Sequence, residues 1–170
     1  GELRSYQNSY SAPVVVGQVM SDNDSSWSAF WSMGATRFDP ADSGNLSVGK
    51  HVAEDTNTTR ADETIGYIVI EQGSGTIDGV KYVAGLGADT VQGPDNSATP
   101  YSYSLSGGLS SASAAAVSIS AMDGNNGAWG VLAGNPAFTS SSIGMFAIEC
   151  QTVDSERNHT HTQMSYIVFE

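Results

Sequence analysis

The chain has 170 residues and a net charge of −12 at pH 7, with only six Lys and Arg. So few cations cannot build a basic surface for phosphate backbones, which disfavours nucleic-acid binding. The 19 Gly and the charged fraction of only 14% are more typical of a secreted β-protein than of a disordered chain. No apolar stretch approaches the length of a membrane span.

Short β-rich segments follow one another along the chain and occur in two copies. Runs of Val, Ile and Tyr bounded by Gly, Asn, Asp and Ser are the signature of strands, and no window keeps a helical period. We therefore predict an all-β fold. In the first copy the expected strands are 13–20, 27–34, 45–54 and 63–71, and in the second they are 114–122, 127–134, 142–153 and 161–170.

The clearest sign of duplication is the last strand of each copy. The stretch 64–71 reads Thr-Ile-Gly-Tyr-Ile-Val-Ile-Glu, and the stretch 163–170 reads Gln-Met-Ser-Tyr-Ile-Val-Phe-Glu. Placing Tyr67 on Tyr166 offsets the copies by 99 residues, and two single-residue gaps extend the match. This predicts two juxtaposed, internally repeated antiparallel β-sandwich or jelly-roll-like modules. Both alternating faces of these two strands are apolar, which favours central strands covered on two sides.

The first copy continues where the second stops. Asp78-Gly79 between Ile77 and Val80 is a tight-turn signal, so we expect a hairpin that the second copy lacks. The last strand of the second copy is then expected to present an open edge. The resulting division is an N-terminal extension at 1–12, a first β-module with the extra hairpin at 13–92, a linker and entry strand at 93–111, and a second β-module at 112–170.

The N-terminal extension lies outside the repeat and is a candidate donor strand. An open strand edge is a pairing hazard that a free segment can cover, in the same molecule or in a neighbour. We expect Leu3, Tyr6 and Tyr10 to make the self-assembly contacts. Pairing within the chain and pairing between chains both stay open at this point.

Two acidic loops occupy equivalent places and are candidates for Ca²⁺. Asp22, Asp24 and Asp123 offer oxygen ligands, although Asp, Asn and Gly are also ordinary turn residues and the calcium-loop pattern is missing. Turn chemistry is therefore the default interpretation, and no other cofactor is expected. His159 and His161 could share a metal from one strand face, but surface histidines flanking a strand are the favoured interpretation.

Aromatic residues and sequons raise the possibility of glycans. Trp27, Trp31 and Trp129 could stack on sugar rings, although packing in the core is the favoured interpretation. Four Asn-x-Ser/Thr triplets in predicted loops are glycosylation candidates. They begin at Asn23, Asn45, Asn57 and Asn158.

Catalysis is not expected, because the chain has none of the common nucleophile, phosphate-loop or zinc motifs. Cys150, the single cysteine, lies in an apolar run and is predicted to be a buried, inert thiol.

The repeated Tyr-Ile-Val strands resemble repeats of secreted bacterial proteins, with some likeness in pattern to H-type-lectin-like sandwiches. The two juxtaposed modules with a free N-terminal segment also resemble subunits of bacterial extracellular fibrils. These resemblances imply an extracellular or cell-surface structural subunit that assembles with copies of itself, head to tail. The alternative is a secreted carbohydrate-binding, lectin-like module. A hydrolase is the third and weakest reading.

Overall fold

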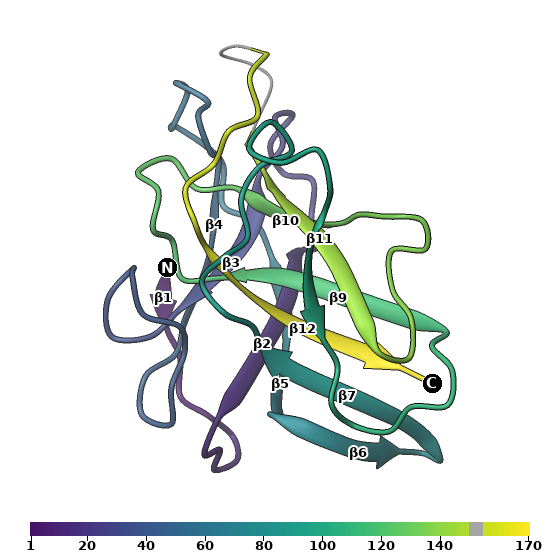
Figure 1. Cartoon of the computed structure of the whole chain (residues 1–170). Coiled ribbons are helices and arrows are strands. Elements are labelled where there is room, and N and C mark those ends of the chain that lie inside the picture. The colour runs from purple at the N-terminus through teal and green to yellow at the C-terminus, as the bar shows by residue number, and fades with distance from the viewer. Residues whose placement is uncertain (150–154) are drawn as a thin grey trace.

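The computed structural model describes residues 1–149 and 155–170, and within them the fold is all-β with no helix (Figure 1). Residues 150–153 of the strand predicted at 142–153, and Cys150 with its predicted buried thiol, lie outside these described residues. The strands are β1 (Glu2–Leu3), β2 (Pro13–Val19), β3 (Ala29–Met33), β4 (Ser47–His51), β5 (Ile65–Glu71), β6 (Gly73–Ile77), β7 (Val80–Leu86), β8 (Tyr101–Ser104), β9 (Ala114–Ser120), β10 (Trp129–Leu132), β11 (Ser142–Ile148) and β12 (Gln163–Phe169).

These strands form three sheets, and the largest takes strands from both halves of the chain. Its order is β1-β4-β3-β9-β12-β7-β6, and strands of the two halves pair in parallel at β3–β9 and antiparallel at β12–β7. A three-stranded sheet has the order β10-β11-β8, and β2 and β5 form a two-stranded ribbon. Both halves repeat the same antiparallel pairings, because β2–β5 and β3–β4 correspond to β9–β12 and β10–β11.

The hairpin predicted around Asp78-Gly79 is confirmed as β6–β7. Ile77 pairs with Val80, and the two turn residues have φ of +48° and +86°. Positive φ at both central positions is the geometry of the tight turn that matches the twist of a hairpin.

The last strand of the second half has no open edge, which corrects the prediction made from the missing hairpin. β12 lies between β9 and β7, so Val168 pairs with Ala115 on one side and Val83 on the other. The strand that covers the second edge of β12 is β7 of the first half. It reaches β12 because the β6–β7 hairpin turns away from β5. Gly73, with φ of +128°, stands at that turn, a conformation that L side chains rarely adopt.

β5 is consequently an edge strand, and the prediction that the strand at 64–71 is central is wrong. Within the described residues its only strand partner is β2, and Ile68 is 55% exposed. Both faces of β5 nevertheless contact apolar clusters. Tyr67 packs against the cluster that contains Phe30, whereas Ile70 packs against the cluster that contains Ile167.

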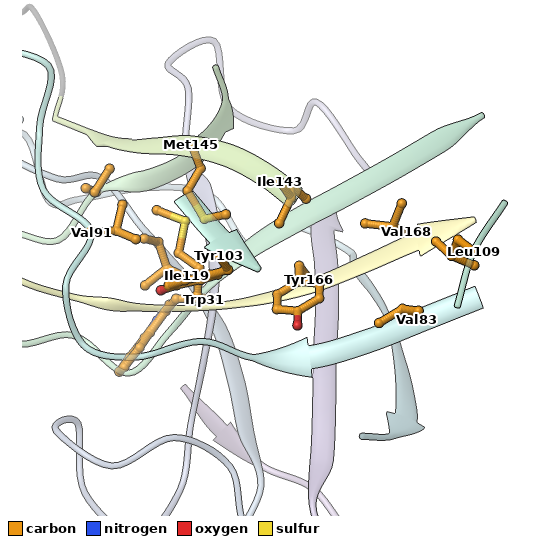
Figure 2. Packing of buried hydrophobic residues seen from close by; sticks show 13 residues of the cluster. Trp31, Val83, Val91, Tyr103, Leu109, Ile119, Ile143, Met145, Tyr166 and Val168 are labelled. Carbon is orange, nitrogen blue, oxygen red and sulfur yellow. The ribbon is translucent and has the colours of Figure 1, made fainter. Parts of the chain in front are cut away.

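The core lies mainly around β12, where the prediction of a central strand covered on two sides is confirmed. Met164, Tyr166 and Val168 enter the largest cluster, together with Ile143 and Met145 of β11 (Figure 2). Ile167, on the opposite face of β12, packs against β2. Successive strand residues point to opposite faces, so the three-stranded sheet and the β2–β5 ribbon cover opposite sides of β12.

Candidate functional site

The N-terminal segment, residues 1–10, folds back along its own chain. In β1, Glu2 pairs with Val48 of β4, and the next bond runs from the Arg4 N–H to the Leu46 carbonyl at 2.8 Å. β1 is only two residues long, and its Leu3 side chain is 77% exposed. Leu3 therefore contributes little apolar burial to holding the segment in place.

Tyr6 makes the main side-chain anchor of this segment. Its half-buried ring packs against the cluster of Val15 and Phe30, and its hydroxyl donates to the Asp42 carbonyl at 2.6 Å. Burial, followed by the charge of Asp42, raises the pKa of Tyr6 to about 12. The phenol therefore stays a neutral donor across the physiological range.

Tyr10 connects the segment to β5. Its ring meets the Tyr6 ring edge to face, with centroids 5.4 Å apart, and its hydroxyl donates to the Val69 carbonyl at 3.2 Å. The two predicted tyrosine contacts thus lie together, whereas Leu3 points away from them into solvent.

The base of the segment is fixed by Glu71, the last residue of β5. Its carboxylate accepts the N–H groups of Ser11 at 2.9 Å and Ala12 at 2.8 Å. The equivalent Glu170 in the second half accepts the N–H of Ser110 at 2.7 Å. The final Glu of each repeat therefore holds the start of its own half, and in the first half this bond separates the segment from β2.

Two surface grooves run between the N-terminal segment and β5. One has a volume of about 660 Å³ and extends from Glu2 and Arg4 to Ile65 and Tyr67. The other has about 470 Å³ and extends from the stretch 5–8 to Tyr67 and Val69. The outer edge of β5 is thus reachable along most of its length, with the segment as the opposite wall.

The predicted Ca²⁺ ligands lie in two separate loops. Asp22 is exposed, and the Asp24 carboxylate accepts the N–H groups of Ser26 and Ala61, both at 2.9 Å. Those bonds, first that from Ser26, lower the pKa of Asp24. In the other loop, burial and then the charge of Asp89 raise the pKa of Asp123. Asp24 thus has the turn role that the default interpretation assigns to it.

A different acidic group brings its oxygens close together. Within the described residues, ligand atoms of Glu54, Glu149 and Glu156 all lie within 4.8 Å of one another. Asn126 Nδ2 donates to Glu54 at 3.1 Å and to Glu149 at 3.3 Å. Such oxygen donors suit a hard cation such as Ca²⁺. Sequence reasoning missed this group because Glu54 is far in the chain from Glu149 and Glu156, and the three residues share no motif.

The histidines correct one expectation. His161 is exposed, but His159 is only 4% exposed and its Nδ1 lies 2.5 Å from a carboxylate oxygen of Glu149. It is therefore not a surface histidine. Burial lowers the pKa of both His159 and His51 to about 4, and the nearby Glu149 carboxylate opposes this shift at His159.

The three tryptophans separate into two environments. Trp31 is 8% exposed and belongs to the core cluster, so its ring is closed to a sugar. Trp27 and Trp129 are half-buried and meet edge to face with centroids 4.8 Å apart, beside a groove of about 570 Å³. Those two rings are the ones that a ligand could reach.

The four sequon asparagines all lie outside the strands. Asn23, Asn57 and Asn158 are exposed, whereas Asn45 is half-buried and its amide donates to Asp42 at 3.1 Å. The first three therefore present their amide groups more openly than Asn45.

A scan against protein-family models, a search of curated proteins and a search of solved structures each found no match to this chain. In the part of the chain that the structure describes, no helix has the length and apolar character needed to cross a membrane.

Proposed function

We propose that this chain is an extracellular structural subunit that polymerises head to tail, with residues 1–10 of one copy adding a strand to the next. The observation that carries the proposal is the way this segment is held. It has a two-residue strand, two half-buried tyrosines and an exposed Leu3, whereas the sheets behind it are closely packed.

A segment held by so few contacts can leave its own subunit and pair with a strand edge of a neighbour. Exchange of identical segments is a low-cost route to assembly. Here the donor segment and the acceptor edge are different surfaces, so the contact is heterologous and builds a filament wherever it does not close into a ring.

Two repeated β-sandwich modules are part of the same proposal. Support comes from the strand pairing, since β2–β5 and β3–β4 recur as β9–β12 and β10–β11. Two packed modules would give each subunit a rigid body that carries both the donor segment and the acceptor edge.

Deleting residues 1–10 tests the proposal. The complete chain should form filaments in negative-stain images and elute as large species in size-exclusion chromatography, whereas the truncated chain should stay monomeric. A matched control changes Ile77 and Val80, which are also exposed but lie at the tip of the β6–β7 hairpin, to Ser. This control should assemble normally. Filaments of undiminished length from the truncated chain would rule out the donor role.

Carbohydrate binding is the second candidate, and the Trp27–Trp129 pair favours it. Two half-buried aromatic rings beside a groove can present faces and edges on which a sugar ring stacks. A glycan array with Trp27→Ala and Trp129→Ala distinguishes this candidate from the first. Saturable binding that either substitution removes would support a lectin-like role. If the wild-type chain binds no glycan on the array, that role is ruled out.

A further inference from the structure

The outer edge of β5 carries backbone groups that the fold leaves largely unused. Met20 donates to the Thr64 carbonyl, and Gln72 donates to the Ala12 carbonyl, so even-numbered positions of this stretch face β2. Residues alternate in an antiparallel ladder, so Ile65, Tyr67 and Val69 direct their N–H and C=O groups outward.

Among the bonds of the described residues, only one reaches these outward groups. The Tyr10 hydroxyl donates to the Val69 carbonyl, and it does so through a side chain rather than through backbone pairing. The two grooves beside Tyr67 keep the other outward groups open to the surface. β5 thus has the unpaired edge that an extended segment recognises.

The chain's own segment cannot pair with this edge along its length in the position it occupies. From Tyr10 back toward the N-terminus the segment leaves β5, because Tyr6 is bonded to Asp42 and β1 is paired with β4. Its base is held at the other end by Glu71. Both ends are therefore committed to places away from the middle of β5.

The same segment of a second copy escapes those constraints once it leaves its own β4 and Asp42, and it matches the edge in charge. The stretch 5–10 reads Ser-Tyr-Gln-Asn-Ser-Tyr and has no charged residue, and 64–70 has none either. In a chain of net charge −12, a neutral donor against a neutral edge avoids the repulsion that most other contacts between copies would meet.

The tyrosine spacing supplies the second point of fit. Tyr6 and Tyr10 are four residues apart, so in a strand they share one face. In its own subunit Tyr6 already packs against the cluster that includes Tyr67 and Val69. We propose that residues 5–10 of a second copy add as a strand to the outer edge of β5, with both tyrosines facing this cluster. This inference rests on the proposed function and names its acceptor.

A proline at position 69 tests the acceptor in the full-length chain. Val69→Pro removes an outward N–H and blocks the edge, and it leaves the β2 ladder intact because that N–H is not part of it. We expect a folded chain, checked by circular dichroism, that forms no filaments.

Thr76→Pro is the matched control at the other free edge. The two-residue turn makes Ile77–Val80 a hydrogen-bonded pair, so Ser74 and Thr76 of β6 point their backbone groups outward. This variant should assemble like the wild type. Filaments of normal length from Val69→Pro would overturn the acceptor assignment, while the deletion of residues 1–10 judges the donor role separately.

Hydrogen exchange on the wild-type chain gives a second readout that needs no variant. On assembly, the amides of Ile65, Tyr67 and Val69 should exchange more slowly, by on the order of tenfold or more, as they gain partners. The amides of Ser74 and Thr76 should not change. Equal exchange at β5 in monomer and filament would also overturn the assignment, even if Val69→Pro failed to fold.

Discussion

β5 and β12 share the pattern Tyr-Ile-Val followed two residues later by Glu, yet they occupy opposite positions in the fold. β12 has a strand on each side, whereas β5 has β2 alone. The equivalent residues Ile167 and Ile68 are 1% and 55% exposed. The environment of a repeated strand is therefore decided by the strands that come to lie beside it and not by its own residues.

Proline substitution should give the largest difference in stability between equivalent changes in β12 and β5. Val168 is fully buried and paired on both sides, so Val168→Pro breaks a ladder bond at a cost of about 3 kcal/mol or more, in addition to lost packing. Total stabilities are about 5–15 kcal/mol, so we expect this variant to be largely unfolded. The equivalent Val69→Pro should fold. Circular dichroism and thermal melting measure both, and similar melting temperatures would contradict the comparison.

Truncating the equivalent isoleucines should give the next largest difference. Ile167→Ala leaves a cavity between β12 and β2 and should lower the free energy of unfolding by about 2–5 kcal/mol. Ile68→Ala removes an exposed side chain and should cost less than about 1 kcal/mol. Urea denaturation followed by fluorescence compares the two variants. Equal losses would mean that Ile68 is covered in solution, for instance by another copy.

The strands and the hairpin were predictable because their signals are local. Val- and Ile-rich runs and the Asp78-Gly79 turn act within a few residues, and β2, β6 and β7 follow them closely. The partner of the hairpin was not predictable. The contact between Val83 and Val168 joins residues far apart in the chain, and no sequence spacing predicts it. The wrong assignment of the open edge came from treating each repeat as if it closed its own sheet.

The candidate site divides in the same way. Tyr6 and Tyr10 were identified because they lie in a segment outside the repeat, and the structure brings them together. The group of Glu54, Glu149 and Glu156 escaped notice because only the fold assembles it. Leu3, which is 77% exposed, shows the limit of judging a residue by its apolar side chain alone.

Two histidines, His51 at the end of β4 in the first half and His159 in a loop of the second half, make stability depend on pH. Burial holds the pKa of His51 at about 4, against an ordinary value of 6.5, so the folded state keeps it neutral. The contribution of neutral His51 to the free energy of unfolding is therefore fully present above about pH 6.5. It is lost as the pH falls toward 4. From His51 alone the loss is roughly 3 kcal/mol.

His51→Gln isolates this contribution, since the amide has no charge to gain. Unfolding free energies measured by urea between pH 7 and pH 4 should fall less steeply for the variant than for the wild type. Parallel curves would show that the pKa of His51 does not change on folding.

The smallest effect is expected at the two glutamates that end the repeats. Glu71→Gln weakens the bonds to the N–H groups of Ser11 and Ala12, and Glu170→Gln does the same at Ser110. Amide exchange at the released groups should rise on the order of tenfold, with little change in melting temperature. Only the first change loosens the base of the donor segment, so only Glu71→Gln should speed filament formation. If Glu170→Gln speeds it equally, the segment at 1–10 is not the part that moves, because Ser110 lies in the other half of the chain.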